Sequence, residues 1–357
     1  MNYINNITEA IGNTPLLKLN NIGKGIGGNV FVKLEHLNPS GSYKDRMALS
    51  MINAALEGNT WNGKKLPENG TVLEASAGNT APAIACVCAA KGLKSRLVLY
   101  RYQMENPNNS RMLITRAYGP EVTISSEPAK YLAESDLDSL CPDEPDIPHV
   151  LAAKMDCQLI EDQDPNAVWV DQIYNPANLN GQKEMGREIY RQLDGKIDAV
   201  GCSASSGASL YGMCLGLAEY GLRPGLVFGV VPEGSECYLN LPKRECDYGE
   251  FEIGSSREKV AKAMGLNKWV SEKSIIHRMV EAGYPDKCFL VSDNDAREMA
   301  NRLCREEGIF CGMSSGANVL IALEIAKRLG PGKNVVTTIV DRRDRYLSET
   351  PYEKYVV

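Results

Sequence analysis

The sequence predicts an α/β protein with two domains, each built on a twisted, mostly parallel sheet flanked by helices. The main evidence is a repeated pattern in which an apolar strand leads through a loop of small residues into a helix. The length of 357 residues suggests roughly two domains. The pattern occurs in residues 70–92 (GTVLEASAGNTAPAIACVCAAKG), 197–221 (IDAVGCSASSGASLYGMCLGLAEYG) and 308–330 (GIFCGMSSGANVLIALEIAKRLG).

The composition limits the classes of function. The net charge is -6, and no basic cluster interleaved with aromatic residues offsets it, which argues against a nucleic-acid partner. No apolar run is long enough to span a membrane. The first residues, MNYINNITEAIGN, have neither the basic nor the apolar region of a secretory signal. We therefore expect a cytoplasmic enzyme.

The eleven cysteines are an odd number and include no C-x-x-C pair. Cys86, Cys88, Cys202 and Cys214 lie in apolar segments, where free cysteine behaves as a small hydrophobic residue. We expect reduced thiols rather than disulfides or metal ligands. The three histidines are far apart in the sequence and indicate neither a zinc site nor a Ser-His-Asp triad.

Residues 23–28, GKGIGG, match the G-x-G-x-x-G pattern of dinucleotide-binding sites. That pattern requires a strand before it and a helix after it. Here the residues that follow, NVFVKLEHL, place Val30, Val32 and Leu34 on one face of a strand. A glycine turn between two strands is the better interpretation, and a Rossmann dehydrogenase is rejected.

The next segment, NPSGSYKDRMA (38–48), places Lys44 where this strand ends and a helix begins. Ser42 and Asp45 have the spacing of a capping box, so Lys44 should lie in the first turn of the helix. Partial positive charge at this end of a helix favours the neutral amine. A neutral lysine is a nucleophile toward carbonyl groups, whereas most lysines are solvated surface charges.

Two later segments show little periodicity. Residues 134–168 are acidic and contain several prolines, which predicts an exposed excursion or a crossing between domains. Residues 240–275 are irregular and charged, and we interpret them as a surface region near the mouth of the second domain.

Four loops of small residues open helices: the Lys44 loop, SAGNT (76–80), SSGAS (205–209) and MSSGA (313–317). Backbone N–H groups at helix starts bind anions, and Ser or Thr hydroxyls add donors. A reactive lysine among several anion sites suits pyridoxal 5'-phosphate (PLP), whose aldehyde forms a Schiff base and whose phosphate needs an anion site. A second anion site would take a substrate carboxylate.

Five segments are similar, in order along the chain, to the signatures of one family. They are KLEHLNPSGSYKDRMA (family KLE-x-x-NP-x-GS-x-KDR), EASAGNTAPAIA (T-S-G-N-T), QIYNPANLNGQKEMGREI (Q-F-x-NPAN), GIFCGMSSGANVLIAL (G-I-S-S-G-A) and DRYLS (ERYLS). The chain thus resembles a divergent member of the cysteine synthase family, PLP enzymes of the tryptophan-synthase β fold type (fold type II). The resemblance implies a homodimer, with a smaller substrate-binding domain at 45–160 and a larger cofactor-binding domain formed by 1–44 and 161–357.

The resemblance also implies roles for matching residues. Lys44 would form the Schiff base and later move the substrate's α-proton, while Asn79 would contact the ring hydroxyl oxygen. Ser314 would meet the pyridine nitrogen, where a hydroxyl partner leaves that nitrogen largely unprotonated and favours β-elimination over transamination. The phosphate would be held by Ser205, Ser206, Gly207, Ala208 and Ser209. The substrate carboxylate would be surrounded by Ser76, Ala77, Gly78, Thr80 and Gln172.

Simpler interpretations and departures from the family pattern stand beside these roles. Ser76, Ser206 and Ser314 could be plain helix caps, and Gln172 an ordinary surface residue. Ala77 replaces a hydroxyl of the family loop, and SSGAS is poorer in glycine than the usual phosphate loop. The family's Gly-Ile-Gly substrate cover has no clean counterpart in FEIGSSREKVAKAMG (251–265).

The function implied is PLP-dependent β-replacement on a β-substituted L-alanine, of the O-acetylserine or O-phosphoserine type, through an aminoacrylate. One alternative is an L-cysteine or L-serine β-lyase that releases sulfide. Another, from a different class, is a non-catalytic member of the fold that binds a ligand or partner. The intact Lys44 motif and SAGNT loop count against the non-catalytic alternative.

Overall fold

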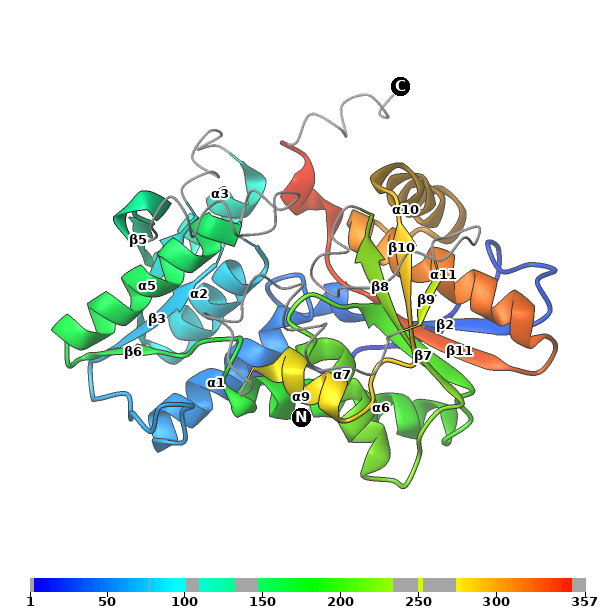
Figure 1. The fold of residues 1–357 in the computed structure, drawn as a ribbon, viewed down its shortest axis with the longest axis horizontal. Coiled ribbons are helices and arrows are strands. Elements are labelled where there is room, and N and C mark those ends of the chain that lie inside the picture. The colour runs from blue at the N-terminus through cyan, green and yellow to red at the C-terminus, as the bar shows by residue number, and fades with distance from the viewer. Residues whose placement is uncertain are drawn as a thin grey trace. The chain divides into compact units, whose positions relative to one another are not determined.

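The computed structural model describes residues 3–76, 78–100, 109–131, 147–233, 250–252 and 274–348. The chain divides into two compact units, and most of their helices and strands are labelled in Figure 1. The first unit comprises Met1–Ile11, Asn38–Gly181 and Arg343–Val357, and the second comprises Gly12–Leu37 and Gln182–Arg342.

These bounds differ from the expected 45–160 because strand β6 (Ala167–Trp169) pairs with β3 (Thr71–Ala75), which extends the first unit. The assignment of substrate to one domain and cofactor to the other stays a prediction.

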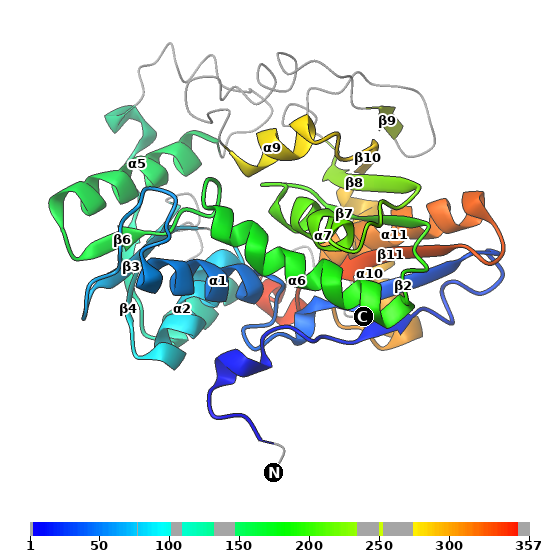
Figure 2. The same cartoon turned by 90° about the horizontal axis from the view of Figure 1, so that it is seen from below.

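The first unit is built on a parallel sheet with the strand order β5-β4-β3-β6, as the strand-loop-helix pattern predicted. Successive residues of β3 point to opposite faces: Val72 packs with one hydrophobic cluster and Leu73 with another. Figure 2 shows α1 and α2 side by side on the first of these faces. The remaining elements are β4 (Lys94–Leu99), β5 (Glu121–Ile124), α1 (Lys44–Glu57), α2 (Thr80–Lys91), α3 (Ser110–Ala117) and α5 (Ile147–Gln163), with 3-10 turns η1 (Ile7–Ala10), η4 (Pro128–Lys130) and η6 (Arg343–Tyr346).

The prediction that residues 134–168 form an exposed excursion is wrong for the part from Ile147 onward. That part contains helix α5 and the buried strand β6. Two of its four acidic residues, Asp156 and Glu161, are buried with partners. Asp156 accepts hydrogen bonds from Ser126 and Tyr131. Glu161 accepts the backbone N–H of Trp169 at 2.9 Å. Residues 134–146 lie outside the described residues, as do 240–249 and 253–273 of the second irregular segment.

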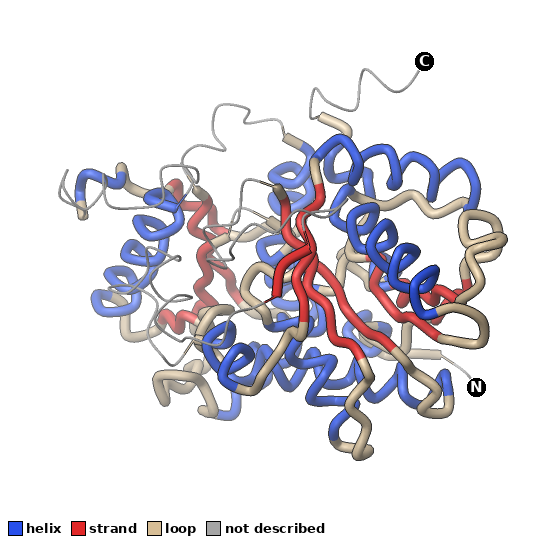
Figure 3. The backbone as a smooth tube through the Cα atoms, turned by 45° about the vertical axis from the view of Figure 1, so that its right-hand side comes forward, coloured by secondary structure: helices blue, strands red, loops and turns tan. Residues whose placement is uncertain are grey.

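The second unit is built on a larger sheet with the order β1-β2-β11-β7-β8-β10-β9 in the described residues. Its inner pairs are parallel, whereas β1 and β9 at the two edges run antiparallel to their neighbours. Figure 3 shows the twist of these strands. The strands are β1 (Leu16–Lys18), β2 (Asn29–Leu34), β7 (Ala199–Ser203), β8 (Leu226–Pro232), β9 (Glu250–Glu252), β10 (Lys287–Val291) and β11 (Asn334–Ile339). The helices are η2 (Glu35–Leu37), α6 (Pro176–Leu193), which begins at the end of the first unit, α7 (Ala208–Ala218), α9 (Ile275–Glu281), α10 (Asp293–Glu307) and α11 (Met313–Leu329).

The GKGIGG segment lies between the antiparallel strands β1 and β2, so its interpretation as a glycine-containing connection between strands is confirmed. Val30, Val32 and Leu34 lie on strand β2, as predicted; Val30 and Val32 are buried and Leu34 is half-buried. On the opposite face of β2, Lys33 is fully buried, and its Nζ lies 2.6 Å from Oε2 of Glu188. The hydrophobic pattern gave no sign of this ion pair.

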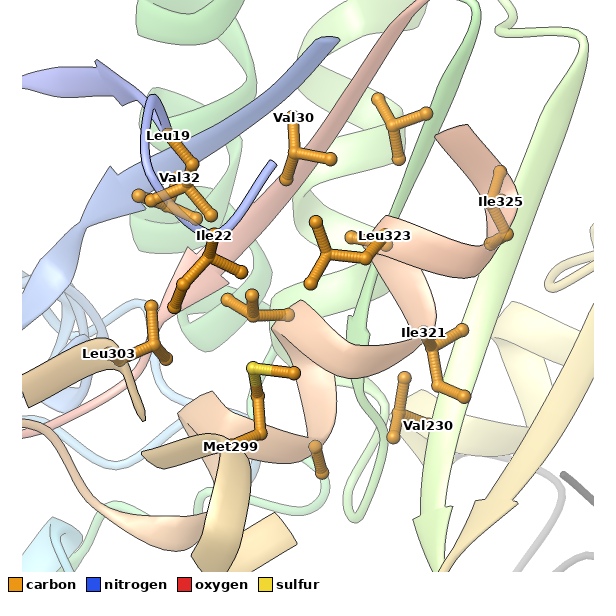
Figure 4. Close-up of a cluster of buried hydrophobic side chains, with 14 of the residues drawn as sticks. Leu19, Ile22, Val30, Val32, Val230, Met299, Leu303, Ile321, Leu323 and Ile325 are labelled. Carbon is orange, nitrogen blue, oxygen red and sulfur yellow. The ribbon is translucent and has the colours of Figure 1, made fainter. Parts of the chain in front are cut away.

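One hydrophobic cluster holds α10 and α11 against the larger sheet. Figure 4 shows Val30 and Val32 of β2 facing side chains that include Leu323 of α11, with Met299 and Leu303 contributed by α10. Full burial of an aliphatic side chain of this kind is worth about 1.5–3 kcal/mol. The cluster therefore fixes the start of α11, where Ser314 lies.

The eight cysteines within the described residues form no disulfide bonds, and Cys86, Cys88, Cys202 and Cys214 are all buried. Burial raises the pKa of the Cys88 thiol to about 12, which keeps it protonated. Among the helices that the structure describes, none combines the length and apolar character needed to cross a membrane.

Candidate active site

Lys44 is the first residue of α1, at the helix start where the sequence placed it. The residue is 8% exposed, and its Nζ lies 4.9 Å from the centroid of the Tyr43 ring. Tyr43 is the N-cap of α1, and its side chain makes no capping hydrogen bond. The lysine amine is thus largely shielded from water at the positive end of a helix.

The predicted capping box between Ser42 and Asp45 is wrong. The carboxylate of Asp45 instead accepts hydrogen bonds from the backbone N–H of Ser40, at 2.6 Å, and from the Ser40 hydroxyl. The reason is the position of the helix start: with Tyr43 as N-cap, Asp45 is the second helical residue and not the third. Asp45 therefore fixes the loop that precedes Lys44.

The SAGNT loop connects β3 to α2. The hydroxyl of Ser76 accepts the backbone N–H of Gly78 at 3.1 Å. Thr80, the first residue of α2, donates a hydrogen bond to Oε1 of Gln172 at 2.7 Å. Four of the five residues expected to surround the substrate carboxylate thus belong to one loop and one turn of the first unit. The fifth, Ala77, lies outside the described residues.

Arg345, which the sequence placed only within the DRYLS motif, joins two of the predicted loops. It is 2% exposed and donates hydrogen bonds to the backbone oxygen of Ser40 and to Oδ1 of Asn79. The Lys44 loop and the start of α2 are therefore linked by one buried guanidinium group. No local spacing could reveal this contact, because Arg345 and Asn79 are 266 positions apart.

The residues expected to bind phosphate and the ring nitrogen belong to the second unit. Gly207 is the N-cap of α7 with a φ of 76°, and Ser205 and Ser206 precede it. Ser314 lies in the first turn of α11, where the next residue, Ser315, accepts the backbone N–H of Val340 just beyond β11. Strands β7 and β11 are parallel neighbours, so the loop after β7 and the start of α11 lie at the same edge of the sheet.

The helices that follow the four small-residue loops share one feature. Their N-caps are Tyr43, Asn79, Gly207 and Gly312, and none makes a side-chain capping hydrogen bond. By contrast, the N-caps of α3, α9 and α10 do accept such bonds. Ser76, Ser206 and Ser314 are therefore not N-caps. At α1, the Ser42 hydroxyl accepts the backbone N–H of Lys44 at 3.3 Å. At α2, α7 and α11, a start without a side-chain cap leaves backbone N–H groups for other partners, which fits the binding of anions.

Glu74 is an ionisable residue within β3 that the sequence analysis did not single out. It is 1% exposed and accepts the backbone N–H groups of Ala75 at 2.9 Å and Gln172 at 3.1 Å. Burial and the nearby Asp171 raise the pKa of Glu74 to about 8, so the carboxyl group is mostly protonated at neutral pH. The signal available in the sequence was a glutamate that follows the apolar residues Val72 and Leu73 within the strand.

A family model described as "Pyridoxal-phosphate dependent enzyme" matches residues 7–341. The chain belongs to the pyridoxal-phosphate dependent enzyme family. Cysteine synthase 1 of Emericella nidulans is 32% identical over 348 residues, covering 96% of this chain and 84% of that protein. Cysteine synthase B of Salmonella typhimurium is 31% identical, covering 97% of this chain and 95% of that protein.

Solved structures of similar proteins have the same fold. An O-acetylserine dependent cystathionine beta-synthase from Helicobacter pylori matches with a TM-score of 0.74 and 27% identity, covering 99% of this chain and 100% of that one. A hydrogen sulfide-producing enzyme from Fusobacterium nucleatum matches with a TM-score of 0.73 and 26% identity, covering 97% and 99%. The expected fold, PLP fold type II, is thereby confirmed.

The residues present fit the family's cofactor. PLP needs an amine for its aldehyde and an anion site for its phosphate. Lys44 supplies a shielded amine at a helix start, and α7 starts at a glycine that brings no side chain to its first N–H groups. Ser205, Ser206 and Ser209 add hydroxyl groups beside that helix start.

Proposed function

We propose that this PLP-dependent enzyme catalyses β-replacement on a β-substituted L-alanine, such as O-acetylserine or O-phosphoserine, in the manner of a cysteine synthase. The observation that carries the proposal is the 2.7 Å hydrogen bond from Thr80 to Gln172, which brings together two residues expected to bind the substrate carboxylate. The relatives named cysteine synthase and the O-acetylserine dependent enzyme of Helicobacter pylori support this substrate class.

When bound, PLP supplies an electron sink that stabilises negative charge at the α-carbon of an amino acid. We propose that Lys44 anchors it, Asn79 contacts its ring oxygen and Ser314 its ring nitrogen. The phosphate ligands would be the backbone and hydroxyl groups of Ser205, Ser206, Gly207, Ala208 and Ser209.

The remaining residues bind and orient the substrate. The start of α2 attracts the α-carboxylate through its N–H groups, and the Thr80 hydroxyl and Gln172 amide fix the direction from which it binds. Lys44 then serves as the base that holds and returns the α-proton, because its amine is shielded from bulk water. The carboxylate-binding group would consist of Ser76, Ala77, Gly78, Thr80 and Gln172.

A second candidate is a β-lyase acting on L-cysteine or L-serine. It is favoured by the likeness to a hydrogen sulfide-producing enzyme and by Ala77, which lacks the hydroxyl of the usual carboxylate loop. A carboxylate held by one donor fewer is positioned less tightly. Reaction of the substrate with water, or release of the product into solvent, then competes better with the addition of a nucleophile.

One experiment distinguishes the candidates. The holoenzyme is incubated separately with O-acetylserine, O-phosphoserine, cysteine and serine, with and without sulfide, and every product is identified. Rapid cysteine formation from O-acetylserine or O-phosphoserine and sulfide supports β-replacement, whereas sulfide or pyruvate from cysteine supports the lyase. If none of the four compounds changes the cofactor's absorbance, the β-substituted alanine assignment fails and a non-catalytic role is favoured.

We also propose a homodimer located in the cytoplasm and acting without a nucleic-acid partner. The homodimer is supported by the family motifs. The location is supported by the thiols of the described residues, which form no disulfide bonds and are mostly buried. The lack of a nucleic-acid partner is supported by the net charge of -6. Sedimentation of the active holoenzyme tests the assembly: a fully active monomer would contradict it.

A further inference from the structure

Two buried carboxyl groups and one ammonium group meet next to Gln172. Glu74 of β3 and Asp171, which follows β6, are each 1% exposed. Lys154 reaches in from α5, and its Nζ lies 3.2 Å from Oδ2 of Asp171. Buried charges of this kind are stable only when they are paired, so Lys154 is the counter-ion on which this cluster depends.

Aromatic rings enclose the ammonium group. The side chain of Lys154 is 13% exposed, and its Nζ lies 5.1 Å from the ring centroid of Trp169 and 4.7 Å from that of Tyr174. The ring of Trp61 contacts both aromatics, with centroid distances of 5.7 Å and 5.9 Å. These rings attract the cation and exclude water from it, which strengthens its interaction with Asp171.

The cluster also determines the backbone of the turn that carries Gln172. Asp171 has a φ of 38°, a left-handed conformation that non-glycine residues adopt at a cost. Its Oδ1 accepts the backbone N–H of Ile173 at 2.9 Å, which stabilises that conformation. Glu74 accepts the N–H of Gln172, and Asn178 donates to the Gln172 backbone oxygen at 2.7 Å. Each hydrogen bond limits where the Gln172 side chain can lie.

We propose that Lys154 is a positioning residue for the carboxylate-binding group: by holding Asp171 it fixes the 171–174 turn, and thereby keeps Gln172 in place beside Thr80. The inference rests on the proposed function, because it assigns a support to the site that would bind the substrate carboxylate. Lys154 itself has no contact with the reacting atoms in this proposal.

The charge of the cluster gives the proposal a second consequence. Because the pKa of Glu74 is raised to about 8, Glu74 is mostly neutral at neutral pH, and Asp171 and Lys154 then balance each other. Other titratable groups near Glu74 come from the elements that pack against β3. Helix α5 contributes the Cys157 thiol. On β4, the residue opposite Glu74 is the apolar Leu97. Helix α2 has one acidic or basic residue, Lys91, which is the last residue of the helix. Ionisation of Glu74 therefore adds an unbalanced negative charge near a bound carboxylate.

The test compares Lys154→Met with Lys130→Met in the holoenzyme. Lys130 is a matched control because it also faces a buried carboxylate on α5: its Nζ lies 3.5 Å from Oδ1 of Asp156. Asp156, however, accepts hydrogen bonds from Ser126 and Tyr131 and not from the 171–174 turn. The first readout is the apparent Kd of L-alanine, which has no β-leaving group, measured from the cofactor's absorbance. The second is amide hydrogen exchange of the peptide that contains residues 170–175.

We expect Lys154→Met to weaken L-alanine binding by about tenfold or more and to speed exchange at Gln172 and Ile173. Lys130→Met should leave both readouts unchanged to within about twofold. Lys154→Arg should restore both, because it keeps the charge. A Lys154→Met variant that loses thermal stability but matches Lys130→Met in both readouts overturns the proposal.

Asp171→Asn provides a test that does not depend on the folding of the Lys154 variant. Removing the Asp171 charge lowers the pKa of Glu74 and leaves the ionised Glu74 carboxylate balanced by Lys154, so the weakening of L-alanine binding around pH 8 that we expect in the wild type should be absent. An unmoved pH profile counts against the proposal. If L-alanine has no effect on the wild-type spectrum, the proposed function fails, while the exchange of Gln172 and Ile173 still decides whether Lys154 positions the turn.

Discussion

The guanidinium group of Arg345 donates a hydrogen bond to the side-chain oxygen of Asn79. When the oxygen of an amide accepts a hydrogen bond from an arginine, the NH2 group of that amide points away from the arginine. There it can act only as a hydrogen-bond donor. Asn79 is thereby oriented for the role implied for it, contact with the ring oxygen of PLP. Arg345 also bonds the backbone oxygen of Ser40, so the same group stabilises the loop before Lys44.

Replacing Arg345 by Lys should weaken PLP binding by about tenfold and lower the thermal stability. Lysine lacks the planar fork that reaches Ser40 and Asn79 together. The matched control is Arg96→Lys, because Arg96 lies on β4 and bonds Thr123 on β5. Equilibrium titration of the apoprotein with PLP measures the effect. Equal PLP affinity in the two variants would contradict the orienting role of Arg345.

The two anion sites should respond differently to loss of a hydroxyl group. Thr80→Val removes the hydrogen bond to Gln172, and we expect it to raise the KM of the amino-acid substrate by about tenfold with little change in PLP affinity. Ser209→Ala should instead weaken PLP retention. Steady-state kinetics and PLP titration of both variants separate the effects, and a reversed outcome would show that the loop assignments are exchanged.

Glu74 makes stability depend on pH. With its pKa at about 8 in the folded protein against an ordinary 4.5, the folded state keeps a proton that the unfolded state releases between these values. Stability therefore falls as pH rises through this window. In Glu74→Gln the fall from about pH 5 to about pH 8 should be smaller, by about 1.4 kcal/mol or more, the equivalent of one pKa unit.

Urea unfolding of the wild type and Glu74→Gln at several pH values measures this difference. Lys154→Met is unsuitable as a control because it changes the same cluster, whereas Lys130→Met should keep the wild-type slope. Parallel curves for wild type and Glu74→Gln would mean that the Glu74 carboxyl group titrates near its ordinary value.

Gly207→Ala should impair both stability and PLP binding. Gly207 and Gly221 lie at opposite ends of α7 and have similar φ values, 76° and 71°. Alanine at either position should cost about 1–2 kcal/mol for the left-handed backbone. Only at Gly207 would the added Cβ lie 3.2 Å from atoms of Met279, since nothing lies within 4 Å at Gly221.

Chemical denaturation and PLP titration of Gly207→Ala and Gly221→Ala measure these effects. We expect both variants to lose stability, but only Gly207→Ala to lose PLP affinity, because its neighbour Met279 must move and the proposed phosphate loop moves with it. Equal PLP affinity in the two variants would argue against phosphate binding at the start of α7.

Local spacing predicted those parts of the fold that depend on neighbours in sequence. The strand that carries Val30 and Val32, the connection at GKGIGG and the helix start at Lys44 are all of this kind. Local spacing gave a wrong prediction for residues 147–168, which were expected to be exposed because acidic side chains usually face water. Asp156 and Glu161 are buried instead.

The candidate site was only partly predictable for the same reason. Family motifs indicated which residues belong to it, but not what holds them. Asp45 was expected to cap α1, yet it bonds Ser40 because the helix starts one residue later than a capping box requires. The contact of Arg345 with Asn79 joins segments that no local pattern connects.

The assignment of Lys44 as the lysine that binds PLP can be tested directly. The holoenzyme is reduced with borohydride and digested, and the peptide that carries the pyridoxyl group is identified by mass spectrometry. Lys44 is expected, because its amine lies at a helix start and is shielded from water. Modification of the peptide containing Lys44 and of no other confirms the assignment, whereas a pyridoxyl group on Lys33, Lys154 or any other lysine would contradict it.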